Sequence, residues 1–116
     1  MSRDDAALLD LVNAAHLIQS FVQDMTKESF MVDLKTQSAV LHQVAVIGEA
    51  VKRLSQGFRE SHPILPWLSM AGMRDHLIHG YDAVDLEEVW KTATHDVAEV
   101  LVKLEPLVPR RPVDCA

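Results

Sequence analysis

Residues 40–58 read VLHQVAVIGEAVKRLSQGF, and the repeat of their apolar side chains decides the fold. The apolar positions are four, three, four, three and four residues apart, which is typical of a helix face packed against other helices. They are Val40, Val44, Ile47, Val51, Leu54 and Phe58. Thr36 is expected to cap the start of this helix, and Gly57 to take the left-handed position that ends it. Gly48 lies inside the helix, where glycine costs about 1 kcal/mol relative to alanine, so we expect another backbone to approach closely there.

The segment before this helix also has a helical pattern. An apolar stripe predicts an N-terminal helix with Asp4 or Asp5 as its cap, and residues 27–34 are expected to form a short helix or turn. The stripe comprises Leu8, Leu11, Ala15, Ile18, Val22 and Met25.

Proline and aspartate mark the helices of the second half. Pro66 can open a helix that stops at Gly80. Asp85 can start the last helix by pairing with Glu88 in a capping box, and Pro106 ends that helix.

These segments predict an all-α protein. We expect an up-down helical bundle of four to five helices over residues 1–105, followed by a Pro-rich polar tail over residues 106–116. A chain of 116 residues fits one domain. Because its long helices carry wide apolar stripes for so small a chain, we also expect a homodimer that shares apolar surface.

Composition excludes several other classes of protein. Hydrophobic residues make up 48% and charged residues 24%, which argues against a disordered chain, and 5% aromatic residues argue against an all-β sandwich. The single cysteine, Cys115, excludes a disulfide framework and a zinc site built from cysteines of one chain. The acidic N-terminus is unlike a signal peptide and no apolar run is long enough to span a membrane, so we expect a cytoplasmic protein.

The formal net charge of −6 argues against a protein that coats polyanions without specificity, yet the charge is uneven along the chain. Residues 52–79 carry a net +2, whereas residues 1–51 and residues 80–116 each carry −4. The basic residues of the central window are Lys52, Arg53, Arg59 and Arg74. Such a window is where a phosphate would be expected, although ordinary charge scatter on a solvated face gives the same pattern.

The densest group of ionisable residues is MRDHLIHGY, residues 73–81. On one helix Asp75 and His79 would be i,i+4 neighbours, and His79 would lie in the last turn, where the helix dipole favours imidazolium. Arg74 would lie about 140° around the helix from His79. The two can therefore converge only through the long arginine side chain, a distorted helix end or a second subunit. Tyr81 would stand just beyond the helix end.

An arginine and a histidine without a nucleophilic serine or cysteine suit metal-free cleavage of RNA. His79 would move a proton at the ribose 2′-hydroxyl or the leaving oxygen, and Arg74 would stabilise charge on the phosphate. A metal site at His76 and His79, spaced i,i+3, is a weaker alternative, because two histidines alone are a poor ligand set. The same residues could also be surface residues that only close a helix.

The stretches around these residues resemble the HepT-like family of the HEPN superfamily. They are ILPW (64–67), MAGMRD (70–75), LIHGY (77–81), VDLEEVW (84–90) and IGEAVKRL (47–54). The resemblance covers residues 5 to about 105, and the family's R-x4-H-x-Y motif falls on Arg74, His79 and Tyr81.

The resemblance implies a compact helical bundle that dimerises and places two R-x4-H motifs in one cleft. It implies a metal-independent endoribonuclease with Arg74 and His79 as catalytic residues, acting as the toxin of a type VII toxin–antitoxin pair. The expected partners are an RNA substrate and an MntA-like minimal nucleotidyltransferase antitoxin, which adenylylates Tyr81. Added AMP would block RNA entry by its bulk and negative charge. The resemblance implies no metal and no cofactor.

Two acidic residues complete the expected site. Asp75 stands where relatives most often have asparagine, and it would weaken phosphate affinity while raising the basicity of His79. Glu49 either supports the cleft or lies on the surface between helices. The alternative function is a non-catalytic HEPN module whose dimer binds and regulates a minimal nucleotidyltransferase.

Overall fold

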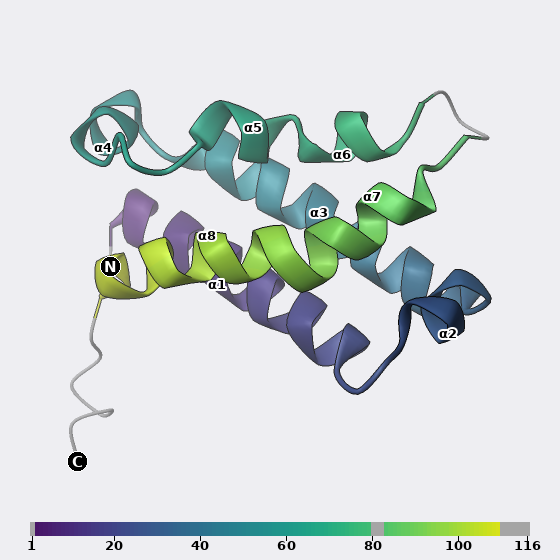
Figure 1. Ribbon diagram of the computed structural model, residues 1–116. Coiled ribbons are helices and arrows are strands. Elements are labelled where there is room, and N and C mark those ends of the chain that lie inside the picture. Colours follow the sequence, from purple (N-terminus) through teal and green to yellow (C-terminus); the bar gives the residue numbers. More distant parts are fainter. Residues whose placement is uncertain (1, 80–82, 110–116) are drawn as a thin grey trace, which may run out of the picture.

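A computed structural model of the chain describes residues 2–79 and 83–109, and it confirms the all-α class (Figure 1). The helices are α1 (Arg3–Val22), α2 (Lys27–Met31), α3 (Leu34–Arg53), α4 (Gln56–Ser61), α5 (Trp67–Ala71), α6 (Met73–Leu77), α7 (Leu86–Lys91), a π-helix (Thr92–Asp96), α8 (Val97–Leu104) and a 3₁₀ turn (Glu105–Leu107). Because Thr92 and Asp96 both keep helical dihedral angles, α7, the π-helix and α8 form one continuous rod.

The chain passes to and fro between the two ends of the bundle. It runs along α1, returns along α3, goes back through α5 and α6, and returns through the α7–α8 rod (Figure 1). The helices α1 and α3 pack most extensively, α8 lies against α1, and α5 and α6 lie against α3. This alternation is the predicted up-down topology.

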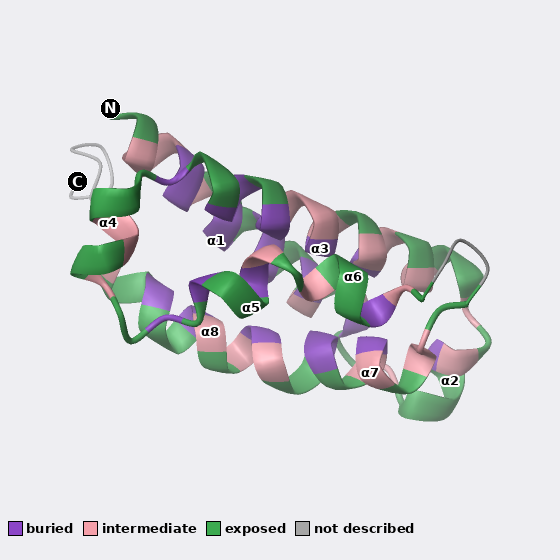
Figure 2. Ribbon diagram, turned by 90° about the horizontal axis from the view of Figure 1, so that it is seen from above, coloured by how far each residue is buried: buried purple, intermediate pink, exposed green. Residues whose placement is uncertain are grey.

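The two predicted apolar stripes form the core (Figure 2). In the α3 region, the stripe residues that are buried are Val40, Val44, Ile47, Val51 and Leu54. From α1 they are Leu8, Leu11, Ala15, Ile18 and Val22, whereas Met25 of the predicted stripe is only partly buried. Each buried valine, leucine or isoleucine contributes about 1.5–3 kcal/mol, so the α1–α3 pair anchors the fold. Phe58, the last residue of the predicted seam, is half-buried and belongs to α4 instead.

The cap of α1 differs from the prediction. Ser2, rather than Asp4 or Asp5, caps this helix, and Asp5 completes the capping box by accepting a hydrogen bond from the backbone N–H of Ser2. Asp4 accepts hydrogen bonds from the backbone N–H and the hydroxyl of Ser55, each at 2.7 Å. These two bonds hold the pKa of the Asp4 carboxyl below its usual value. Asp4 therefore ties the start of α1 to the start of α4.

The ends of α3 also differ from the prediction. Asp33, rather than Thr36, caps α3 by accepting a hydrogen bond from the Thr36 N–H at 3.0 Å. At the other end, Gly57 lies inside α4 and does not take the left-handed conformation predicted for it. Asp85 caps α7 and accepts a hydrogen bond from the Glu88 N–H at 3.2 Å, which is one half of the predicted capping box. The Glu88 side chain does not complete the box, because it does not accept from the Asp85 N–H, which donates to the carbonyl of Leu77.

Beyond α8, Leu107 and Val108 are partly buried against the core. Residues 110–116, which include Cys115, lie outside the described residues, and the domain boundary after residue 105 stays a prediction. Of the helices in the described ranges, none is long and apolar enough to cross a membrane.

Gly48 is the point of closest approach between α3 and α5. A Cβ atom added to it would lie 3.1 Å from the backbone carbonyl oxygen of Ala71, the last residue of α5. That distance is too short for a relaxed contact. The predicted reason for a glycine in the middle of this helix is confirmed: it lets α5 lie directly on the α3 backbone.

Gly48→Ala and Gly57→Ala form a matched pair that tests this approach. Both positions are helical, but a Cβ at Gly57 would meet nothing within 4 Å. We expect Gly57→Ala to raise the free energy of unfolding by up to about 1 kcal/mol through helix propensity. Gly48→Ala should lower it by about 1 kcal/mol, because α5 is pushed away. Urea denaturation measures both, and equal stabilisation by the two substitutions would contradict the close approach.

Candidate active site

The helix predicted from Pro66 to Gly80 is broken. Gly72 separates α5 from α6, and the two short helices follow each other along α3. Trp67 anchors the start of α5, since its buried indole N–H donates to the backbone carbonyls of Arg59 at 3.1 Å and His62 at 3.0 Å. Arg74 therefore lies in the short helix α6, directly after α5, whose start is fixed by Trp67 and whose last residue, Ala71, lies against Gly48 of α3.

His79 does not lie in a helical turn, which corrects the prediction. The helix α6 ends at Leu77, and Ile78 is extended and forms an antiparallel bridge with Val84. The backbone N–H of His79 donates to the carbonyl of Ala83 at 2.7 Å. Neither the helix dipole nor an i,i+4 relation to Asp75 therefore acts on His79. Tyr81 lies outside the described residues, as do residues 80 and 82.

A cavity of about 280 Å³ lies between α3 and the α5–α6 segment. Its lining residues are Ala45, Gly48, Glu49, Lys52, Ala71, Arg74 and Asp75. Three of the residues proposed from the sequence, Arg74, Asp75 and Glu49, are thus brought together. His79 is exposed and is not one of the residues that line this cavity. Among the described residues, this cavity therefore contains Arg74 without His79.

The charged groups of the cavity form two loose ion pairs. Arg74 Nη1 lies 3.8 Å from Asp75 Oδ1, and Lys52 Nζ lies 3.5 Å from Glu49 Oε1. All four side chains are more than half exposed. Exposed pairs of this kind contribute about 0–1 kcal/mol, so an incoming phosphate can displace either carboxylate.

The other two basic residues of the central window, Arg53 and Arg59, do not line this cavity. Arg53 Nη2 lies 2.6 Å from Asp10 Oδ2 and links α3 to α1. Arg59 is half-buried in α4 and its carbonyl accepts from the Trp67 indole. The cationic window predicted from the sequence therefore reaches the cavity through Lys52 and Arg74.

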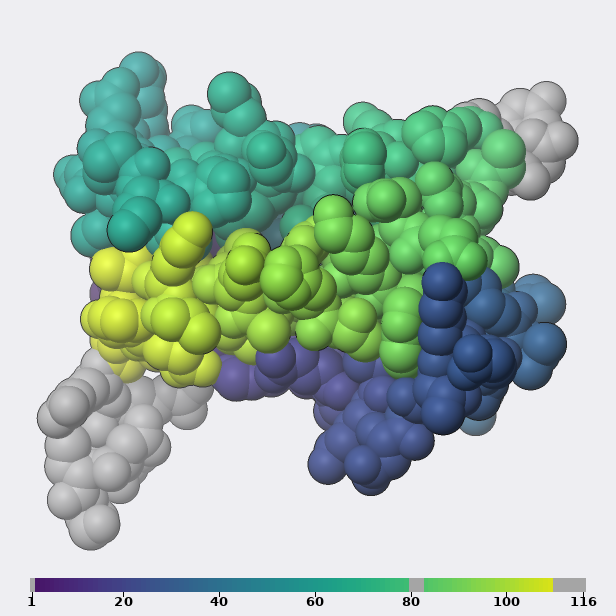
Figure 3. Space-filling view, viewed as in Figure 1, coloured from purple at the N-terminus to yellow at the C-terminus, as the bar shows by residue number. Residues whose placement is uncertain are grey.

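The alternative metal site at His76 and His79 requires both residues on one helix, and α6 ends at Leu77, between them. His76 Nε2 instead lies 3.5 Å from Glu88 Oε2 on α7. It lines a larger cavity of about 410 Å³ on the side of α5–α6 that faces the α7–α8 rod. Figure 3 shows that side, where the two segments pack along each other.

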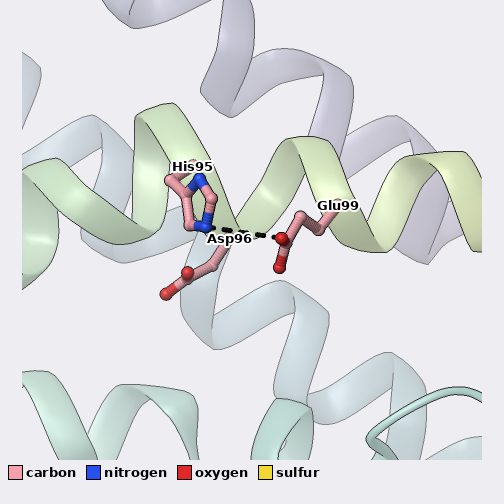
Figure 4. A group of neighbouring side chains, drawn as sticks. All are labelled: His95, Asp96 and Glu99. Atoms are coloured by element: carbon pink, nitrogen blue, oxygen red, sulfur yellow. Dashed lines mark ion pairs between the residues drawn. The ribbon is translucent and has the colours of Figure 1, made fainter.

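In the described part of the chain, one group of ligand-type side chains gathers elsewhere, at the junction of the π-helix and α8 (Figure 4). Ligand atoms of His95, Asp96 and Glu99 lie within 4.8 Å of one another, and His95 Nε2 is 3.4 Å from Glu99 Oε1. None of the three lines the Arg74 cavity. The i,i+4 spacing of His95 and Glu99 makes this pair visible in the sequence, whereas the approach of Asp96 depends on the backbone.

Lys52 is the cavity residue that sequence reasoning did not single out. The sequence contained the signal, because Ala45, Gly48 and Lys52 are three and four residues apart, Glu49 is four after Ala45, and such residues share one face of a helix. Gly48 marked that face as one approached by another backbone. Lys52, one turn further along, follows from the same periodicity.

The fold and the cavity define a class: a small up-down helical bundle with an arginine-bearing broken helix laid over its second long helix. The model of the family described as "Ribonuclease HepT-like" matches residues 11–107. This chain therefore belongs to the HepT-like family of the HEPN superfamily, and the resemblance is confirmed.

Individual relatives agree with this membership. The chain is 42% identical over 100 residues to "Probable ribonuclease HepT" of Thermococcus cleftensis, covering 86% of this chain and 91% of the relative. It is 38% identical over 103 residues to each of two Methanocaldococcus jannaschii proteins named as candidate RNases. These matches cover 89% of this chain and 85% and 89% of the two relatives. No solved structure matches the chain significantly.

Proposed function

We propose that this protein is a metal-independent endoribonuclease in which Arg74 and His79 act on the scissile phosphate. The observation that carries the proposal is the position of Arg74 in an open, polar cavity of a chain whose relatives are named as ribonucleases. In the reaction the ribose 2′-oxygen bonds to phosphorus while the bond to the 5′-oxygen breaks. His79 takes the 2′-hydroxyl proton or protonates the leaving oxygen, and Arg74 stabilises the charge on the phosphate.

A second copy of the chain completes this site. His79 is not among the described residues that line the cavity of Arg74, and a neighbouring copy that brings its own motif to the same cleft would supply the missing histidine. Uncovered apolar residues support association, since Ile64 is 71% and Leu68 is 86% exposed beside and within α5. Two-fold dimers are the commonest arrangement of identical chains. The proposal therefore includes a homodimer with a composite cleft.

The proposed biological role is that of a toxin neutralised by adenylylation. Tyr81 follows His79 by two residues in the sequence, and an MntA-like minimal nucleotidyltransferase is the proposed antitoxin. An AMP group on the Tyr81 hydroxyl adds bulk and a negative phosphate next to the residue that moves the proton. The second candidate function is a non-catalytic module that binds such a transferase, favoured by the loose neutral pairing of Arg74 with Asp75.

RNA cleavage in the presence of EDTA separates these two functions. We expect the wild-type protein to cut single-stranded RNA, and Arg74→Ala and His79→Ala each to lose at least about 100-fold in rate. His16→Ala, on the far side of the core in α1, should retain wild-type activity. Intact RNA with the wild-type protein would refute the ribonuclease and leave the non-catalytic module, and equal cleavage by His79→Ala would refute His79 as the catalytic residue.

Mixing two inactive variants tests the composite cleft. When Arg74→Ala and His79→Ala dimers exchange subunits, each mixed dimer regains one intact Arg–His pair across the two chains. We expect about a quarter of the wild-type activity per chain, because half of the exchanged dimers are mixed. A mass tag on one of the two variants lets native mass spectrometry distinguish the mixed dimers and verify the exchange. A mixture without activity, despite verified exchange, would show that each chain uses its own pair.

Mass spectrometry tests the regulatory role of Tyr81. Incubation with the cognate nucleotidyltransferase, ATP and Mg²⁺ should add one or more AMP units to the wild-type protein and to His79→Ala. The adducts should be absent from Tyr81→Phe, which lacks only the hydroxyl. The same adducts on Tyr81→Phe would place the modification elsewhere, and cleavage by fully adenylylated protein would refute the neutralisation.

A further inference from the structure

Lys52 and Arg74 reach one cavity from two different elements. Lys52 lies one turn after Gly48 on α3, and the contact of Gly48 with the carbonyl of Ala71 holds α5 against that face. Arg74 follows from α6 on the opposite wall. A sphere with the volume of the cavity is about 8 Å across, no wider than the Debye length of about 8 Å at physiological ionic strength. Both cations therefore act on any anion that enters.

The carboxylates beside them leave these cations available. The pair between Lys52 and Glu49 is 3.5 Å long, spans three residues of one helix, and joins side chains that are 62% and 73% exposed. A pair of this type is weak, whereas a phosphate oxygen forms a shorter, charge-assisted bond to an ammonium group. Lys52 differs in this from Arg53, whose pair with Asp10 is 2.6 Å long and ties two core helices together.

We infer that Lys52 binds a second backbone phosphate of the RNA, adjacent to the phosphate held by Arg74. The inference rests on the proposed ribonuclease function and extends it to the substrate. The preferred substrate is a single-stranded RNA with at least two successive phosphates, and a dinucleoside monophosphate is a poor one. Glu49, next to Lys52, weakens the hold on that second phosphate and so sets how readily RNA leaves.

Short substrates of defined phosphate content test the inference directly. The probes are a dinucleoside monophosphate and the same molecule carrying an added 5′- or 3′-phosphate. For the better of the two phosphorylated substrates we expect Lys52→Ala to lower kcat/KM about tenfold, mainly through KM. For the unphosphorylated dinucleoside the loss should stay below about twofold, because Lys52 then has no phosphate to bind. Lys52→Arg should restore most of the preference.

Lys35→Ala is the matched control, since Lys35 is an exposed lysine at the other end of the same helix. It should leave the rates on all three substrates unchanged. Equal losses on all three substrates with Lys52→Ala, or no loss on any, would overturn the inference. Circular dichroism establishes that the helical content of each variant is that of the wild type.

A binding measurement separates failure of this inference from failure of the proposed function. In the His79→Ala background, fluorescence anisotropy follows a labelled single-stranded RNA across a range of salt concentrations. Adding Lys52→Ala should weaken binding and make the slope of log K against log salt shallower by about 0.7, the value for one phosphate contact on a single strand. Adding Glu49→Gln should strengthen binding. An unchanged slope refutes the role of Lys52 even in an active ribonuclease, and a shallower slope supports it even where no RNA is cut.

Discussion

The approach of α5 to α3 at Gly48 is the contact on which the candidate site depends. With the Ala71 carbonyl only 3.1 Å from where a Cβ would stand, the two backbones meet without a side chain between them. Ala45 and Lys52 lie about one turn before and after Gly48 on α3, and both line the cavity that also contains Arg74. The position of the cavity therefore depends on the close packing of α5 against α3, which requires a glycine at position 48.

The early end of α6 is the second constraint. If the helix continued to Gly80, Arg74 and His79 would be fixed about 140° apart on one rigid element. Instead α6 ends at Leu77, and Ile78 forms a bridge with Val84. Arg74 is therefore in a helix, whereas His79 follows an extended residue. Arg74 is held over α3 and His79 is held by the Ala83 carbonyl. This division is compatible with a motif whose two halves meet across two copies of the chain.

Much of the fold could be predicted because burial on one helix face leaves a repeat in the sequence. The stripes of α1 and α3 and the need for Gly48 were all visible in this way. The caps were less predictable, because Ser2 and Asp5, or Asp33 and Thr36, are both good capping residues one turn apart. The break at Gly72 and the bridge between Ile78 and Val84 were not predicted, because the apolar repeat of residues 66–80 continues across both and conceals the end of each helix. Lys52 was not predicted as a site residue, because its charge entered only the net charge of residues 52–79 and its position on the face of α3 that contains Gly48 was not considered.

The net charge of −6 describes the whole chain, but several of the acidic residues act locally at the starts of helices. Asp5, Asp33 and Asp85 take part in helix caps, and Asp4 binds the start of α4. Their negative charge compensates unpaired backbone N–H groups at helix starts and is local to them. The cavity of Arg74 instead holds two cations and two carboxylates, a neutral set within one Debye length. A phosphate that entered the cavity would interact mainly with these four groups, whose carboxylates are exposed and displaceable. The net charge of the whole chain would matter less. If the chain is the proposed ribonuclease, that contrast favours a short RNA segment over a long polyanion, because attraction is confined to the cavity and the acidic exterior repels the remainder of a longer strand.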